Sequence, residues 1–150
     1  MASWQEVVTE APELADRARA VFDLRKHKAL ATLRRDGSPR ISGIEVEFDA
    51  DEVWLGMMPG SLKACDVRRD PRIALQAMSD DPPEHDPGEW LGDAKIAGVA
   101  VEVAGENPQG GHRFKVDVTE VVLTRVGTPP DHLLIESWHE GRGFSEHKRH

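Results

Sequence analysis

The sequence is poor in cysteine, lacks tyrosine and carries an excess of one sign of charge. Its single cysteine, Cys65, permits neither an internal disulfide nor a metal site built from several cysteines. Among the apolar positions of an expected helix, Cys65 is predicted to be a small packed residue. Acidic residues number 27 against 19 Lys and Arg, a formal charge of -8, which argues against a nucleic-acid partner held by overall positive charge. An anionic ligand therefore requires a local basic site.

Long apolar runs are also missing. No segment is apolar for long enough to cross a bilayer, and the first residues carry acids instead of the basic start of a signal peptide. We therefore expect a cytoplasmic protein with no membrane partner.

Several chemistry-bearing motifs are absent as well. The 7 histidines form no HExxH motif and no helical i, i+4 pair, so we expect no metal site. The chain contains no GxSxG, GxGxxG or P-loop motif, which gives no support to a serine hydrolase or a nucleotide phosphotransferase of those types.

At 150 residues the chain has room for one domain, which we expect to span 1–150. Hydrophobic periodicity and turn signals predict a helix capped by Ser3 and Glu6, a second helix after Pro12, and a short helix over 61–69. Alternation predicts strands, joined by short connections, over 28–35, 40–48, 53–58, 72–78, 94–106, 112–126 and 132–138. Residues 79–90 are predicted to be a surface loop, and the residues after 138 a polar tail.

This order of elements favours a mainly β protein. Successive strands without intervening helices are typical of an antiparallel barrel or sandwich. On the second strand Ile44, Val46 and Phe48 share one face, so Glu45 and Glu47 are expected to be exposed on the other.

The stretch "GMMPGSLKACDVRR" brings a turn and a helix N-terminus together, which is a local anion site. The first backbone N–H groups of a helix lack acceptors and carry partial positive charge. Gly60 allows close approach of a ligand, Ser61 can cap the helix or donate its hydroxyl, and Lys63 adds a full charge. The alternative is an ordinary N-cap at Ser61 and a solvated Lys63.

The block "LATLRRDGSPRISGIEVEFDADEVWLGMMPGSLKACDVRRDPRIAL" resembles the core of the flavin- and deazaflavin-binding split β-barrel family, which includes pyridoxamine 5'-phosphate oxidases and deazaflavin-dependent reductases. The resemblance implies a homodimeric antiparallel split β-barrel with a few short helices and a cofactor groove between subunits. By this resemblance Lys63 and Ser61 hold the cofactor phosphate beside Gly60. The other residues implied to border the ring are Gly56, Met57, Met58, Ser42 and Gly43.

The implied function is an oxidoreductase that moves a hydride between a flavin-type cofactor and a small organic substrate. The cofactor is either the deazaflavin coenzyme F-420 or FMN. The absence of Tyr, with more Arg than Lys, is typical of a GC-rich coding sequence and slightly favours the deazaflavin. The alternative is a non-catalytic split barrel that binds or carries flavin or haem. Trp138, His139 and Arg142 near the C-terminus are candidates for a substrate pocket, and the alternative is that Trp138 anchors the last strand.

Overall fold

The computed structural model describes residues 2–49, 51–104 and 110–150, which form three α-helices, one 3-10 helix and eight strands. The helices are α1 (Trp4–Glu10), α2 (Pro12–Asp23), α3 (Leu62–Arg69) and the 3-10 helix η1 (Pro87–Glu89). The strands are β1 (His27–Leu33), β2 (Pro39–Asp49), β3 (Glu52–Met57), β4 (Arg72–Met78), β5 (Asp93–Glu102), β6 (His112–Val126), β7 (Leu133–His139) and β8 (Gly143–Arg149).

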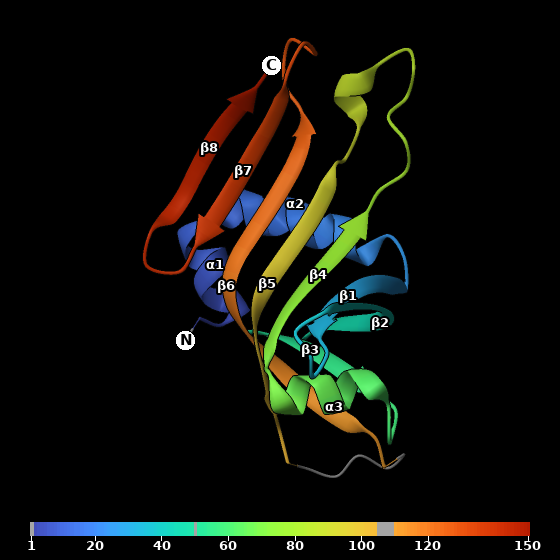
Figure 1. Ribbon diagram of the computed structural model, residues 1–150. Helices are drawn as coiled ribbons and strands as arrows, with labels where there is room; N and C mark the ends of the chain where they lie inside the picture. Colours follow the sequence, from blue (N-terminus) through green and yellow to red (C-terminus); the bar gives the residue numbers. More distant parts are fainter. Residues whose placement is uncertain (1, 50, 105–109) are drawn as a thin grey trace.

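The strands form one antiparallel sheet in the order β3-β2-β1-β4-β5-β6-β7-β8, which closes on itself because β3 also pairs with β6. Six strands therefore make a barrel, and β7 and β8 extend beyond it. Helices α1 and α2 lie behind the extended sheet, and α3 lies at the opposite end of the barrel from the loop between β4 and β5 (Figure 1). The prediction of a mainly β split barrel with short helices is confirmed.

Alternating side chains build the barrel core. On β3, Val53, Leu55 and Met57 are buried, while Trp54 and Gly56 face outward. Side chains alternate in the same way on β6, where Phe114 and Val116 are buried and belong to a continuous apolar core. The outward positions of β2, β3 and β6 are thus free to line a surface site.

The N-terminal helices begin as their sequences predict. The Ser3 hydroxyl oxygen accepts a hydrogen bond from the Glu6 backbone N–H at 3.3 Å, as an N-cap does. Pro12 occupies the first turn of α2, where its missing N–H costs no helical hydrogen bond. The buried side of α2 packs against β4, β5, β6 and β7.

Two local predictions are wrong. The polar tail contains β8, which pairs with β7. Gly141 lies in the turn between them and Gly143 begins β8, at φ 81° and 73°. Because side chains 144–149 are exposed on both faces, the strand carries no hydrophobic alternation to reveal it. Cys65 is exposed, since α3 turns Ala64, Asp66 and Val67 inward instead.

The strand expected over 94–106 is shorter in the structure. It runs from Asp93 to Glu102, and residues 105–109 lie outside the described part of the chain. Within the residues described, no helix is both long and apolar enough to cross a bilayer. No group of three or more His, Cys, Asp or Glu side chains in these ranges is arranged to hold a metal ion.

Candidate functional site

The candidate site is a groove that opens where β2 changes its pairing partner. Residues 39–45 of β2 pair with β1, whereas the pairing of β2 with β3 begins only at Val46 and Leu55. Strand β3 continues beyond Leu55 to Met57 while pairing with β6 alone. The separation leaves backbone polar groups on the facing edges of β2 and β3 without a ladder partner, so that a ligand can approach them.

The groove has a volume of about 1020 Å³ and is lined by residues of β1, β2, β3, β6 and the start of α3. Glycines form part of its surface, among them Gly43 and Gly56. A Cβ atom added at Gly43 or Gly56 would meet no atom within 4 Å, so both positions face open space. A flat ligand can therefore lie directly against the backbone there.

A tight turn connects the end of β3 to the start of α3. The Ser61 N–H donates to the Met58 carbonyl at 3.2 Å, Pro59 occupies the second position and Gly60 the third, at φ 73°. This is the arrangement of a type II turn, which requires a positive φ at its third residue. The Ser61 oxygen then accepts from the Ala64 N–H at 3.3 Å and caps α3.

Lys63 bridges α3 and the separated edge of β2. Its Nζ donates a hydrogen bond to the Gly43 carbonyl oxygen at 3.0 Å, across the opening of the groove. An ammonium group has three donors, so this contact leaves two for a ligand. The side chain is thus held at the groove by a hydrogen bond to a neutral carbonyl group, which does not neutralise its positive charge.

A buried carboxylate ties α3 to the barrel. Asp66 accepts hydrogen bonds from Thr32 of β1 at 2.8 Å, from Arg40 of β2 at 2.7 Å and from Arg69 at 3.2 Å. Burial alone raises the pKa of the Asp66 carboxyl, but hydrogen bonds from Arg40, Thr32 and Arg69 outweigh it and hold the pKa below its usual 3.8. Asp66 is therefore ionised at neutral pH and fixes the helix that carries Lys63.

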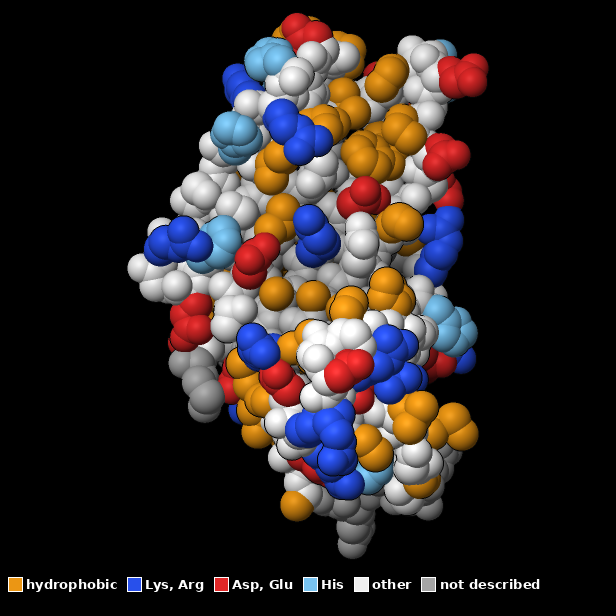
Figure 2. Space-filling view, in the orientation of Figure 1, with side chains coloured by type: hydrophobic (Ala, Val, Ile, Leu, Met, Phe, Trp, Pro, Cys, Tyr) orange, Lys and Arg blue, Asp and Glu red, His pale blue; other side chains and the backbone are white. Residues whose placement is uncertain are grey.

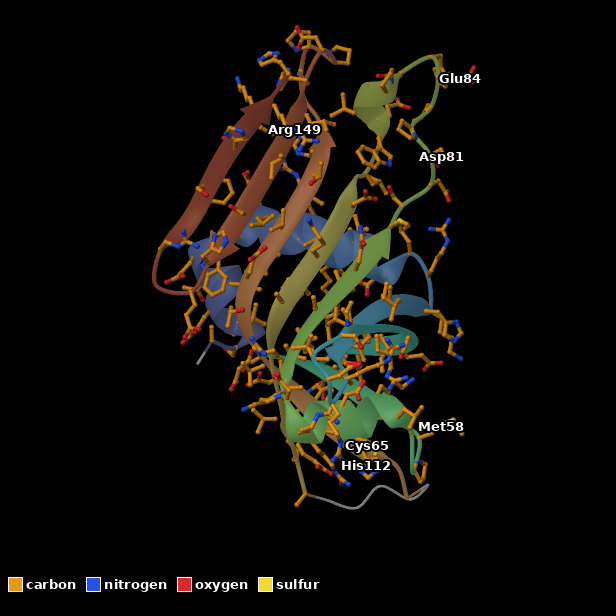
Figure 3. The ribbon with its side chains drawn as sticks, in the orientation of Figure 1. Met58, Cys65, Asp81, Glu84, His112 and Arg149 are labelled. Carbon is orange, nitrogen blue, oxygen red and sulfur yellow. The ribbon has the colours of Figure 1, made fainter. Side chains whose placement is uncertain are left out.

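The other end of α3 is held at the surface. Arg68 donates to both carboxylate oxygens of Glu102, at 2.9 and 2.6 Å, and also contacts His112 Nδ1 at 2.9 Å. The Arg68 hydrogen bond is the main cause that lowers the pKa of Glu102. Figure 3 shows His112 and Cys65 at the same end of the molecule as Met58. Arg68 and Arg69 occupy the last turn, as expected, and additionally bind carboxylates.

The structure gathers part of the predicted cofactor set at the groove. Gly43, Gly56, Met58 and Lys63 line it, and the Met58 side chain is 77% exposed there. Met57 also borders the groove, but its side chain belongs to the core, so its contribution is mainly backbone.

The remaining predicted contacts lie next to the groove. Ser42 shares the face of β2 that carries the buried Ile44, which directs its side chain away from the outward-facing Gly43. Gly60 and Ser61 form the turn and the cap described above. The Ser61 hydroxyl hydrogen is still available for donation, because its oxygen acts as acceptor in the cap.

The predicted substrate residues do not line this groove within one chain. Trp138 is buried and its Nε1 donates to a carboxylate oxygen of Glu10 in α1 at 2.6 Å. His139 lies 3.5 Å from Glu120, and Arg142 is in the turn before β8. Trp138 thus anchors β7 to α1, which was the alternative interpretation of this residue.

Sequence reasoning missed Trp54 and Arg113. Both line the groove, and the Arg113 guanidinium carbon lies 3.8 Å from the centre of the Trp54 ring. Alternation around the apolar Phe114 and Val116 indicates that Arg113 faces outward. Its position beside β3 depends on the pairing of Gly56 with Arg113, which no local signal reveals.

The groove also contains acidic groups, as expected for exposed positions. Glu45 lies 3.5 Å from Lys26 Nζ and 3.8 Å from His27 Nε2. Glu47 pairs in register with Trp54. The groove is therefore mixed in charge, with its cations at Lys63 and Arg113.

Comparison with known proteins identifies the fold. No protein-family model and no curated protein matches the sequence. Among solved structures, the chain is similar to a pyridoxamine 5'-phosphate oxidase-related, FMN-binding protein from Nostoc punctiforme PCC 73102. The two are 9% identical, with a TM-score of 0.66 over 93% of this chain and 96% of that one.

Two further structures broaden the comparison. An F420 reductase is 13% identical, with a TM-score of 0.51 over 67% of this chain and 92% of that one. HutZ, the haem storage protein from Vibrio cholerae, is 14% identical, with a TM-score of 0.52 over 71% and 88%. The protein thus has the split-barrel fold of pyridoxamine 5'-phosphate oxidase-like proteins, a fold that serves more than one cofactor.

Proposed function

We propose that the protein is an oxidoreductase that binds a phosphate-bearing flavin-type cofactor in the groove between β2 and β3. The observation that carries the proposal is the placement of Lys63, held at the Gly43 carbonyl beside the open backbone of Gly56. Space beyond Gly43 and Gly56 suits a flat ring, and the two free donors of Lys63 suit a phosphate. The fold is shared with FMN-binding and F420-dependent proteins.

Each residue has a distinct part in this proposal. Lys63 binds the phosphate, with the Ser61 hydroxyl as a further donor. The Gly56 backbone orients the ring, and the exposed side chain of Met58 shields it from water. When bound, the ring supplies hydride transfer to or from a small organic substrate. Backbone N–H groups on the separated strand edges stabilise negative charge that develops at the ring.

The cofactor is best tested on the protein as isolated. We expect a colourless preparation that binds deazaflavin coenzyme F-420 more tightly than FMN, measured by fluorescence titration. The reduced deazaflavin bound to it should persist in air until an unsaturated acceptor is supplied, because a deazaflavin is a hydride carrier that reacts little with dioxygen. A yellow preparation that releases FMN on denaturation would instead support the flavin form of the proposal.

A second candidate is non-catalytic binding of haem or flavin, which the likeness to a haem storage protein favours. His27 and Met58 border the groove, and both residue types can ligate haem iron. Titration with haemin distinguishes the candidates. A shifted haem absorption band that disappears in His27→Ala, together with no turnover of either flavin-type cofactor, would favour the second candidate.

We also propose that the protein is a homodimer. Four side chains form a row across adjacent strands, from Ile41 through Ala31 and Ala74 to Ala97. Ile41 is 78% exposed, and Figure 2 shows hydrophobic side chains in a row above α3. Small residues permit close approach of a second flat surface, and the row ends two residues from Gly43. A second copy seated here would adjoin the groove.

Light scattering at micromolar concentration should therefore give twice the 16.6 kDa mass of the chain. Ala74→Glu should shift this mass towards the monomer, because it places an unpaired charge in a row that the dimer would bury. Ser145→Glu, on β8, is the matched control and should leave the dimer intact. A monomeric wild-type protein would contradict the proposal.

A further inference from the structure

The groove contains a second cation whose orientation is fixed. Arg113 projects from β6 beside Gly56, and its guanidinium lies over the ring of Trp54, with 3.8 Å from Cζ to the ring centre. A cation at this distance is attracted by the negative face of the ring. This contact restricts the positions that the guanidinium can take beside the groove.

Among the described residues, no side chain or carbonyl group occupies the N–H groups of Arg113, which can therefore bind a ligand. Within residues 2–49, 51–104 and 110–150, no carboxylate or carbonyl oxygen accepts a hydrogen bond from Arg113. By contrast, Arg40, Arg68 and Arg125 each bind a carboxylate of the protein. Stacking uses the face of the guanidinium and leaves its edge, where the donors lie, available.

The neighbouring acids do not neutralise Arg113. Glu45 lies within 4 Å of nitrogen atoms of Lys26 and His27, which are its neighbours instead of Arg113. Glu47 is the register partner of Trp54, and within the described residues no ion pair joins it to Arg113. In the part of the chain that the structure describes, the edge of the guanidinium therefore remains a donor pair without an acceptor.

We infer that Arg113 is a carboxylate-binding residue of the groove, held in place by Trp54. The inference rests on the proposed function, in which Lys63 takes the phosphate. A planar guanidinium edge presents two parallel N–H groups, which match the two oxygens of a carboxylate. The carboxylate belongs either to the acidic tail of a deazaflavin cofactor or to an acidic substrate.

Titration calorimetry with variants distinguishes these sources. The variants are Arg113→Gln, Arg113→Lys and, as a control with the same loss of charge, Arg149→Gln on β8, at the far end of the molecule (Figure 3). The probes are FMN, which has no carboxylate, the tailed deazaflavin coenzyme, and benzoate against benzamide added to the cofactor-loaded protein.

If the carboxylate is in the cofactor tail, Arg113→Gln should weaken deazaflavin binding about ten- to a hundredfold and leave FMN binding unchanged. If it is in the substrate, both cofactors should bind as before, and the preference for benzoate over benzamide should fall by about the same factor. In either case Arg113→Lys should recover only part of the affinity, because an ammonium lacks the paired donors.

Trp54→Leu tests the role of the stack separately. It retains the positive charge and releases the guanidinium, so it should weaken the same probe several-fold, in a variant shown to be folded by circular dichroism. Unchanged binding in Trp54→Leu would remove Trp54 from the inference.

Three results would overturn the role of Arg113: no change with any probe, an equal loss for FMN and deazaflavin, or an equal effect of Arg149→Gln. The proposed function fails separately if the wild-type protein binds neither cofactor. Arg113-dependent binding of benzoate by the cofactor-free protein would then still support the carboxylate site, and its absence would overturn it.

Discussion

Replacing Lys63 with alanine is expected to weaken cofactor binding about ten- to a hundredfold while the protein stays folded. A charge-assisted hydrogen bond to a phosphate contributes roughly 1.5–3 kcal/mol, and this substitution removes the ammonium group from the mouth of the groove. The contact of Lys63 with the Gly43 carbonyl is lost as well, which frees an acceptor that water can satisfy. Fluorescence titration with FMN and with the deazaflavin coenzyme measures the effect.

Two control variants separate direct contact from overall charge. Lys63→Arg keeps the charge and should recover much of the affinity. Lys148→Ala makes the same change in net charge on the exposed strand β8, remote from α3 in Figure 1, and should bind the cofactor like the wild type. Unchanged affinity in a folded Lys63→Ala variant would exclude Lys63 from the phosphate site.

Local sequence patterns predict the elements that surround this site. The alternation of "VWLGMM" places Val53, Leu55 and Met57 inside the barrel, as the structure confirms. "MPGS" has the Pro and Gly positions of a type II turn, so the direction in which α3 leaves β3 follows from four residues. The positions of Ser61 at the helix cap and Lys63 in the first turn could be predicted from the sequence because they depend on this short segment.

The walls of the groove depend on contacts between distant segments. Gly56 and Arg113 lie side by side only because β3 pairs with β6. The groove opens only because the first part of β2 pairs with β1 and its last part pairs with β3. The sequence of a single strand reveals neither pairing. Hydrophobic alternation shows which face of the strand is buried, but it does not show which strand lies next to it. Trp54 and Arg113 were missed for this reason.

Helix α3 shows a different limit of sequence reasoning. An apolar stripe would bury Cys65, but the structure buries Asp66 instead. An ionised carboxylate can occupy an interior position only where donors compensate its lost hydration. Here those donors come from Thr32 and Arg40, on strands distant in sequence, as well as from Arg69. The burial of Asp66 thus depends on the completed barrel.

Asp66→Asn is expected to lower the free energy of unfolding by about 2–4 kcal/mol at pH 7. The substitution leaves Arg40 and Arg69 beside a neutral amide, and the NH2 group of that amide faces hydrogen-bond donors instead of acceptors. Asp23→Asn is the matched control. Its carboxylate is 61% exposed and pairs with Arg19 at 3.6 Å, so its loss should cost less than about 1 kcal/mol. Urea denaturation of the three proteins measures both changes.

The contribution of Asp66 to the stability of the protein should depend on pH, and the sign of this dependence follows from its pKa. The pKa of Asp66 is lower in the folded protein than its usual value of 3.8, so the folded state favours the ionised form. The stabilisation is therefore fully present above about pH 4–5, and it is lost as the pH falls through the folded-state pKa, where both states bind the proton. The stability difference between wild type and Asp66→Asn should accordingly be constant from pH 7 to pH 5 and shrink below pH 4. A difference that persists unchanged in acid would show that Asp66 acts through its shape and neutral hydrogen bonds, and that its charge does not anchor α3.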